Sequence, residues 1–247
     1  MTHTYENLGF GYKVCISPDH RFGTDAFLLA DFAGSRHKDK VCDLCTGNGI
    51  IALLLSRDYQ PAEIYAVELQ ESAYTQLEKS IEASPEEAKK IIPIRSDLKE
   101  WTAPEKLDLI TCNPPYKADG AGIQSDTEAA IIARHETACT ICDVCECAAR
   151  SLKYGGRLCI CNRPERLADV IEAMRKNKIE PKRLRTVHKD KDSEPWLILV
   201  EGRLGGSPFM RIEKPLFIKG ENGESYSEEM KRIYRLYEFQ RQDLEEK

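Results

Sequence analysis

The chain has 247 residues, of which 41% are hydrophobic, and its formal net charge is −5. This size suits one α/β domain with short additions, and the negative charge excludes a polycation that binds nucleic acid over its whole surface. No apolar run approaches the roughly 20 residues that cross a bilayer, and the polar start at 1–7 lacks the apolar segment of a secretory signal. We therefore expect a cytoplasmic protein with no membrane partner.

Helix and strand signals alternate through most of the chain. Strands are expected at 40–45, 63–69, 90–97, 107–112, 155–161 and 195–204, and helices at 50–58, 71–83, 128–153 and 163–177. Apolar strands separated by helices indicate a parallel sheet that is covered on both faces, which is a doubly wound α/β fold.

Two segments lie outside this alternation. Near the start, a hairpin is expected around 17–20, followed by a helix over 24–33. Near the end, Ser225 and Glu228 are spaced as a capping box, and Met230, Ile233, Tyr234 and Tyr237 follow on one helix face. We expect a single domain over 1–247: a hairpin and helix lid at 1–34, a Rossmann-like core at 35–220, and a docking helix in 221–247.

The ten cysteines raise the question of a metal site. Four lie in apolar runs, where a free thiol acts as a small hydrophobe. They are Cys42, Cys112, Cys159 and Cys161. The spacing from Cys139 to Cys147 would suit an iron-sulfur cluster, but apolar residues there recur at three- and four-residue steps, as on one buried helix face. We expect no metal, with a metal- or redox-sensing protein as the alternative.

In an open parallel sheet, ligands bind beyond the carboxyl ends of the strands. Asp43 closes the strand 40–45, and Gly47 to Gly49 then allow a tight turn before a helix whose amino end would face a ligand. Glu68 ends the next strand, where a carboxylate can accept two hydrogen bonds from a ribose diol.

The next two strands also end in polar residues. Ser96 and Asp97 are the last two residues of the strand expected at 90–97, where they could meet an amino group of a purine. The run Asn113-Pro114-Pro115-Tyr116 follows the strand at 107–112. Each feature alone has a simpler explanation as a helix cap or a turn. Their order at four successive strand ends favours one ligand site.

These residues resemble those of class I S-adenosylmethionine-dependent methyltransferases, in the amino-methylating branch that carries Asn-Pro-Pro-Tyr. From about Tyr12 to Tyr234 the chain resembles the bacterial tRNA1(Val) adenine-37 amino-methyltransferase family. The narrower likeness rests on the segments 22–32, 113–122 and 133–136. It implies a seven-stranded, mostly parallel Rossmann-like sheet with the last strand antiparallel.

The resemblance also implies S-adenosyl-L-methionine as cofactor and S-adenosylhomocysteine as product. It places Asp43 and the turn near the methionine part, Glu68 at the ribose hydroxyls and Asp97 at the adenine amine. Thr24 and Asp25 match the segment over the methionine end, with helix capping as an equal alternative. The cofactor contacts expected in full are Thr24, Asp25, Asp43, Cys45, Gly47, Asn48, Gly49, Glu68, Leu69, Ser96, Asp97, Leu98 and Asn113.

Cys45 departs from the family, which usually has glycine there. A Cβ and sulfur narrow the space for a ligand, and a positive φ would cost cysteine about 1 kcal/mol. We therefore expect a negative φ at Cys45 and weaker cofactor binding. The departure also leaves open a catalytically silent RNA-binding scaffold.

The Asn-Pro-Pro-Tyr motif suits methylation of an amine conjugated to a ring. Such an amine is a poor nucleophile, and two acceptors, the Asn113 side-chain oxygen and the Pro114 carbonyl, could hold its two N–H groups and aim its lone pair. Pro114 and Pro115 make the loop rigid, and Tyr116 would stack on the base. Asn113, Pro114, Pro115 and Tyr116 are therefore the expected catalytic residues.

The expected acceptor is the 6-amino group of adenine in RNA, with a tRNA anticodon-loop adenine favoured because a loop base needs only to be splayed out. The segment 175–191 carries eight basic residues against two acids. It is either a solvated helix end and loop or a phosphate-binding edge. The edge comprises Arg175, Lys176, Lys178, Lys182, Arg183, Arg185, Lys189 and Lys191, helped by Arg203, Arg211, Lys214 and Lys219.

Two other acceptors stay open. Release-factor methyltransferases share the motif and act on a protein glutamine amide, but they usually carry an additional amino-terminal helical domain. DNA amino-methylation would need a target-recognition domain, which the sequence does not suggest. No obligate protein partner is evident, and residues 134–136 fit either a helix turn or a substrate-ordered loop.

Overall fold

The protein is described from a computed structural model at residues 3–18, 20–114 and 139–236. The predicted Pro115, Tyr116, Tyr237 and 134–136, and the part of the predicted helix at 128–138, lie outside these described residues. Within the described part, no helix is both long enough and apolar enough to cross a membrane.

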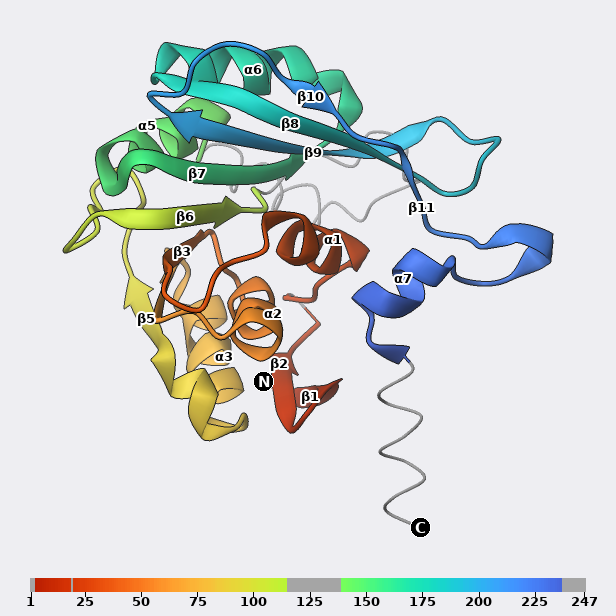
Figure 1. Cartoon of the computed structure of the whole chain (residues 1–247). Coiled ribbons are helices and arrows are strands. Elements are labelled where there is room, and N and C mark those ends of the chain that lie inside the picture. The colour runs from red at the N-terminus through yellow and green to blue at the C-terminus, as the bar shows by residue number, and fades with distance from the viewer. Residues whose placement is uncertain (1–2, 19, 115–138, 237–247) are drawn as a thin grey trace.

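One large sheet forms the centre of the molecule (Figure 1). Its strand order is β10-β8-β9-β7-β6-β3-β4-β5, and β11 also pairs with β8. The strands are β3 (Lys40–Leu44), β4 (Glu63–Glu68), β5 (Ile91–Arg95), β6 (Leu107–Cys112), β7 (Leu152–Asn162), β8 (Ile179–His188), β9 (Pro195–Leu204), β10 (Arg211–Ile212) and β11 (Leu216–Phe217). All neighbours are parallel except β9, which is antiparallel to both β7 and β8.

This arrangement confirms the doubly wound α/β prediction and corrects two details. The sheet has nine strands rather than seven because β10 and β11, two residues each, extend it along β8. The antiparallel strand β9 is the last long strand, but these two short strands follow it in the chain.

The segment 175–191 was not expected to form a strand, yet most of it is β8. Ile179, Leu184 and Val187 of this strand are buried. The charged residues between them obscure the apolar pattern, because long basic side chains pack their aliphatic stems against the protein and leave their charges outside. A register shift at Pro181 further breaks the two-residue period.

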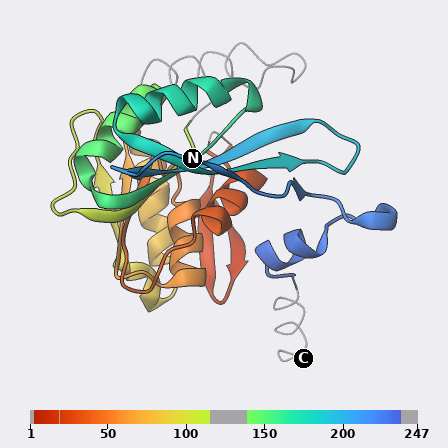
Figure 2. The same ribbon diagram turned by 45° about the horizontal axis from the view of Figure 1, so that its top comes forward.

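Helices cover both faces of the sheet (Figure 2). α1 to α3 pack on one face and α5 and α6 on the other, so each face has its own apolar core. The helices are α1 (Thr24–Ala33), α2 (Ile50–Tyr59), α3 (Glu71–Glu82), α5 (Ile141–Ser151), α6 (Leu167–Lys176) and α7 (Glu228–Ile233), with short 3₁₀ turns at Glu86–Lys90, Pro164–Arg166 and Glu221–Gly223.

Three predicted boundaries were wrong. The amino-terminal hairpin joins β1 (Thr4–Gly9) to β2 (Tyr12–Ile16), and its turn lies at Phe10 and Gly11, where φ is positive, rather than at 17–20. α5 begins at residue 141 because Thr140 and Asp143 form a capping box. The cap of α7 is Ser227, not Ser225.

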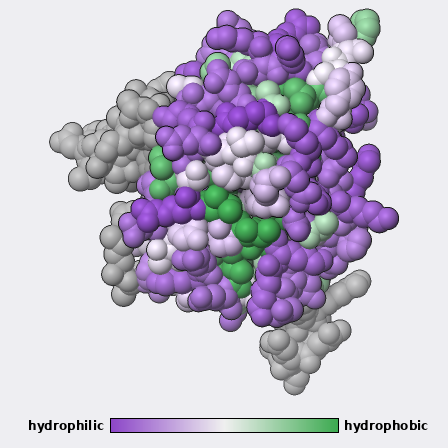
Figure 3. Space-filling view, turned by 90° about the vertical axis from the view of Figure 1, so that its left-hand side faces the viewer, coloured by the Kyte–Doolittle hydropathy of each residue, from purple (hydrophilic) through white to green (hydrophobic). Residues whose placement is uncertain are grey.

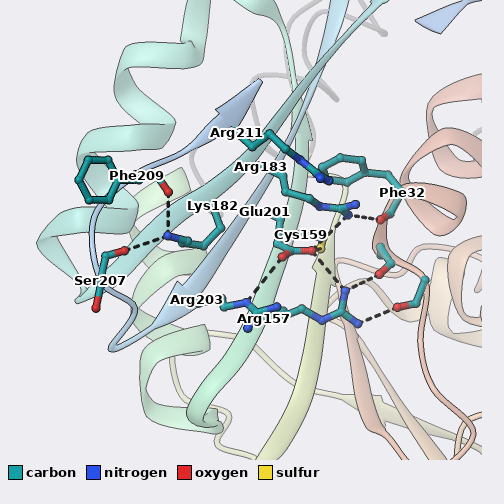
Figure 4. A network of polar contacts seen from close by, with 12 residues as sticks. Phe32, Arg157, Cys159, Lys182, Arg183, Glu201, Arg203, Ser207, Phe209 and Arg211 are labelled. Atoms are coloured by element: carbon teal, nitrogen blue, oxygen red, sulfur yellow. Dashed lines mark hydrogen bonds and ion pairs between the residues drawn. The ribbon is translucent and has the colours of Figure 1, made fainter. Parts of the chain in front are cut away.

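A buried carboxylate ties three strands to the end of α1 (Figure 4). Glu201 on β9 is 4% exposed and lies 3.3 Å from Arg157 of β7 and 3.1 Å from Arg183 of β8. The two guanidinium groups also donate to the carbonyl oxygens of residues 32–34 at 2.6 to 2.7 Å. These carbonyls are at the helix end, where cations are favoured.

We expect Glu201→Ala to lower the free energy of unfolding by about 3 kcal/mol. Removing one partner of a buried ion pair leaves the other charges uncompensated, and the partial exposure of both arginines puts the loss at the low end of the usual range. Urea denaturation measures the loss.

Glu213→Ala is the matched control. Glu213 also pairs with Arg183, at 3.4 Å, but its side chain is more exposed than that of Glu201. Its expected cost is below about 1 kcal/mol. Equal losses in both variants would contradict the role assigned to Glu201.

Candidate active site

The site is built at the carboxyl ends of β3, β4, β5 and β6. Asp43, near the end of β3, is fully buried and accepts hydrogen bonds from the hydroxyls of Thr46 at 2.6 Å and Thr111 at 2.7 Å. Burial raises the pKa of Asp43 to about 7, although the two hydroxyls act in the opposite direction. Its carboxyl is therefore close to half-ionised at neutral pH.

The turn after β3 leaves space for a ligand at one position. Gly47 has φ of 60°, and a Cβ there would meet no heavy atom within 4 Å. Gly49 has φ of 87°, and its missing Cβ would lie 2.5 Å from Leu77 of α3. The turn is thus open on the side of Gly47, whereas Gly49 is required for packing the turn against α3.

Cys45 corrects the sequence expectation. Its φ is 56°, not negative, so the backbone adopts the left-handed conformation that glycine would take without strain. The cost to a residue with a side chain is about 1 kcal/mol. The turn keeps its shape in spite of the cysteine, because the N–H groups of Thr46 and Gly47 donate to Val67 and Glu68 of β4.

Glu68 is one of the groups that hold the turn. Its Oε2 accepts from the Gly47 N–H and its Oε1 from the Gln70 N–H, both at 2.8 Å. The side chain is 5% exposed, while the next residue, Leu69, is 45% exposed. A carboxylate with remaining lone pairs and an open apolar side chain thus lie side by side after β4.

The residues after β5 divide between surface and core. Asp97 accepts from the Lys99 N–H at 2.9 Å and lies 3.5 Å from its ammonium group. Ser96 donates its hydroxyl to the Asp97 carbonyl, and Leu98 is buried in the core under α5 and α6. Of the expected contacts here, Leu98 therefore lies in the core, whereas the carboxylate of Asp97 is partly exposed and is engaged by Lys99.

Asn48, also expected at the cofactor, faces the interior instead. Its side-chain amide donates to the Cys15 carbonyl of β2 at 3.2 Å, and the residue is 3% exposed. The side chain fastens the turn to the amino-terminal hairpin.

Asn113 brings three distant segments together at the end of β6. Its Nδ2 donates to the Asp25 carboxylate at 2.9 Å, and its Oδ1 accepts from the Cys161 thiol at 3.0 Å. The sequence had identified the asparagine and the aspartate, but had assigned Cys161 to the core alone. No local signal marks this cysteine, because its partner is 48 residues away.

The first turn of α1 places Asp25 near Asn113. Gly23 is the N-cap position rather than Thr24 or Asp25, although the Asp25 Oδ1 accepts from the Ala26 N–H of the first turn at 3.1 Å. The Thr24 hydroxyl is hydrogen bonded to that of Tyr234 at 2.8 Å, and the Tyr234 ring packs edge-on against Phe27. The carboxyl-terminal segment thus packs on α1.

The cysteines are all free thiols, and the described residues contain no group of three ligands that could hold a metal ion. Cys145 and Cys147 are buried in α5. Burial raises the pKa of Cys145 to about 12 and that of Cys147 to about 11, so both stay neutral at neutral pH.

The predicted basic edge is not one surface. Arg183 pairs with Glu201, and Arg185 makes two contacts of 2.8 Å with Glu229 of α7. Other members of the edge are also engaged locally. Arg175 pairs with Glu180, Lys182 donates to the carbonyls of 207–209, and Lys191 pairs with Asp192.

The remaining lysines of the edge divide between the two ends of β8. Lys176 and Lys178 precede it, and Lys189 follows it. Lys189 lies at the same end of the sheet as Asn113, beyond the carboxyl ends of the strands, because β8 and β6 run in the same direction.

Among solved structures, the fold is similar to a predicted O-methyltransferase from Agrobacterium tumefaciens, with a TM-score of 0.68 and 18% identity over 85% of this chain and 95% of that one. It is also similar to the T. thermophilus 16S rRNA N2 G1207 methyltransferase, solved with AdoMet and guanosine, with a TM-score of 0.54 and 20% identity over 82% of this chain and 50% of that one. At such identities the likeness shows a shared fold.

Among curated proteins, the chain is 39% identical over 119 residues to the tRNA1(Val) (adenine(37)-N6)-methyltransferase of Pasteurella multocida, covering 45% of this chain and 50% of that protein. It is 27% identical to the protein of the same name from Parabacteroides distasonis, covering 86% of this chain and 88% of the relative. In the Pasteurella, Tolumonas auensis and Erwinia tasmaniensis relatives, the chain spans only 50% to 58% of their length.

A family model described as the methyltransferase small domain matches residues 22–180, which include Asp25, the turn after β3 and Asn113. The match extends over more than half of the chain. The chain belongs to the methyltransferase small domain family.

Proposed function

We propose that this protein is an S-adenosylmethionine-dependent methyltransferase that acts in the cytoplasm on the 6-amino group of an adenine in RNA, with a tRNA anticodon-loop adenine as the target. The observation that carries the proposal is Asn113, held by Asp25 and Cys161 beside the turn after β3. The names of the relatives, tRNA1(Val) (adenine(37)-N6)-methyltransferase, support adenine in tRNA as the substrate.

The residues at the strand ends fit the cofactor. The open space at Gly47 would admit the methionine part, the exposed Leu69 would contact the adenine face, and Glu68 and Asp97 would accept from the ribose hydroxyls and the adenine amine. When bound, S-adenosylmethionine supplies an electrophilic methyl group on a sulfonium. The acidic residues around the turn suit this cationic group.

The chain's own part in the reaction is to hold the amine. The Oδ1 of Asn113 and the carbonyl of Pro114 would each accept one N–H, which draws the nitrogen toward tetrahedral geometry and aims its lone pair. Pro115 would keep the loop rigid and Tyr116 would stack on the base, two roles that rest on the sequence motif. No strong base is required, because the methylated nitrogen is cationic and loses its proton readily.

We expect Asn113→Ala to lower kcat by about 10²- to 10³-fold, the usual effect of removing one acceptor or donor that acts in the transition state. The Kd for S-adenosylmethionine should change less than about threefold, because the Asn113 side chain is assigned to the substrate. Transfer of labelled methyl to total tRNA from cells that lack this protein, with nucleoside analysis, measures the rate.

Asn177→Ala, at the opposite edge of the sheet, is the control and should behave as wild type. Undiminished transfer by Asn113→Ala would contradict the mechanism. Transfer by wild type to a protein glutamine, and not to tRNA, would contradict the substrate.

We expect the affinity for S-adenosylmethionine to rise with pH between 6 and 8. Near Asp43, whose pKa is raised to about 7, a cationic ligand binds best to the ionised carboxylate, so binding below pH 7 must release a proton. Calorimetry should show an increase of about two- to tenfold that levels off above the pKa. Asp43→Asn should remove this dependence, and an unchanged pH profile in that variant would contradict it.

For the RNA we propose a phosphate contact at the carboxyl edge. Lys189 and Lys219 are both exposed, and the Lys219 N–H donates to the Lys189 carbonyl at 2.9 Å, so the two lysines are neighbours. They lie at the edge that carries Asn113. Lys176 and Lys178 lie at the opposite, amino end of β8. Figure 3 shows one side of the molecule, which is mainly hydrophilic with a small apolar patch.

Replacing Lys189 and Lys219 together by alanine should weaken tRNA binding and reduce the slope of log affinity against log salt by about 1 to 2, since each phosphate contact contributes close to one. Replacing Lys176 and Lys178 removes the same charge and should change the slope much less. Filter binding over a salt series compares the pairs, and equal slopes would contradict the assignment.

A further inference from the structure

The side chain of Asn113 is contacted from both of its ends. Asp25 of α1 lies on the Nδ2 side at 2.9 Å, and Cys161 of β7 lies on the Oδ1 side at 3.0 Å. An ionised carboxylate can only accept hydrogen bonds, so the group facing it must be the amide N–H₂. The two contacts therefore specify the same orientation of the amide.

Orientation matters because the two ends of a carboxamide have almost the same shape and opposite hydrogen-bonding character. In the orientation described, the amide oxygen is directed away from Asp25. If the amide were reversed, an N–H₂ group would stand where the substrate amine has to donate, and two donors would face each other. An asparagine without fixed neighbours would spend part of its time in this unproductive orientation.

The thiol acts in the same direction as the carboxylate. Cys161 is fully buried, and burial raises its pKa well above the ordinary value, so the sulfur keeps its proton and can donate. The amide oxygen has two lone pairs. One accepts from the thiol, and the other remains for a substrate N–H.

We propose that Asp25 and Cys161 are positioning residues that hold the Asn113 amide in the one orientation that presents Oδ1 to the substrate amine. This inference rests on the proposed function, because it assigns the amide oxygen to an amine acceptor. It gives Asp25 a role other than the cofactor contact implied by resemblance.

The position of Asp25 is itself fixed at both ends of α1. The carboxyl end is held by Arg157 and Arg183, and the first turn by the hydrogen bond between the hydroxyls of Thr24 and Tyr234. A carboxylate on such a helix can orient a neighbour without losing its own place.

The first test is Asp25→Ala. A charge-assisted hydrogen bond should favour one orientation of the amide over the other by about ten- to a hundredfold. We therefore expect kcat to fall by about the same factor, while the Kd for S-adenosylmethionine changes by less than about threefold. An unchanged kcat, or a loss confined to cofactor affinity, would overturn the role of Asp25. A wild-type enzyme that methylates no tRNA would instead contradict the proposed function.

A reciprocal exchange separates orientation from packing. Asn113→Asp alone puts two carboxylates together and should reduce kcat by more than about 50-fold. Adding Asp25→Asn restores a donor and an acceptor with the charges exchanged, and it should recover at least about tenfold of the loss. If the double variant is no better than Asn113→Asp, the pair does not act by hydrogen bonding.

For the thiol, Cys161→Ala should lower kcat by about threefold to tenfold, since a neutral hydrogen bond is weaker than a charged one. Cys161→Ser should regain most of that loss because its hydroxyl also donates. Cys145→Ala removes an equally buried thiol from α5, away from Asn113, and is the matched control. Equal effects of Cys161→Ala and Cys145→Ala would leave Cys161 with a packing role only.

A readout without catalysis completes the test. The side-chain amide protons of Asn113, assigned in NMR spectra by their loss in Asn113→Ala, should exchange slowly with water in the wild type. In Asp25→Ala the exchange should be at least about tenfold faster, because the hydrogen bond that protects them is gone. Equal exchange in both proteins would overturn the proposal whatever the acceptor of the methyl group.

Discussion

The position of α1 depends on the buried carboxylate of Glu201. This carboxylate compensates two arginines, and the arginines satisfy the carbonyl oxygens that every helix leaves open at its end. Without it, two guanidinium groups would be drawn toward solvent, and the end of α1 would lose its partners. Because a helix is stiff, fixing its last turn also fixes its first turn, where Asp25 meets Asn113.

Two further buried carboxylates shape the turn after β3 in different ways. Glu68 is balanced by two backbone N–H groups, which makes it a structural brace for the turn. Among the described residues, Asp43 accepts hydrogen bonds from two neutral hydroxyls, and the charge of Glu68 adds to the effect of burial in raising its pKa. The repulsion between these two carboxylates would be lowered by a cationic ligand bound in the open space at Gly47.

The sequence predicted what depends on local pattern. The strands β3, β4 and β6 and the polar residues at their ends followed from apolar runs and glycine turns, since these signals lie within a few residues of one another. β8 was missed because its charged residues hide the buried ones. The prediction of a negative φ at Cys45 was wrong. Hydrogen bonds from Gly47 to Glu68 and from Thr46 to Val67 hold the turn in its strained conformation, and such contacts with another strand cannot be read from the local sequence.

Contacts between distant segments account for the rest. The role of Cys161 depends on Asn113, 48 residues away, and on a helix near the start of the chain. The partners of the basic residues on β8 are also remote. Glu201 lies on β9 and Glu229 on α7. Arg183 and Arg185, which look like part of a cationic surface in the sequence, therefore form internal ion pairs, and we call this set of ion pairs between elements the frame.

This frame also joins the carboxyl-terminal helix to the site. Arg185 of β8 holds Glu229, and Arg232 of the same helix reaches Asp31 of α1 at 2.7 Å. Charges that bind parts of the protein to one another are not available to a phosphate backbone, because a nucleic acid would have to displace paired carboxylates first. Under the proposed function, RNA would therefore be recognised by cations outside these ion pairs, and those nearest the carboxyl end of β8 lie at the same end of the sheet as Asn113.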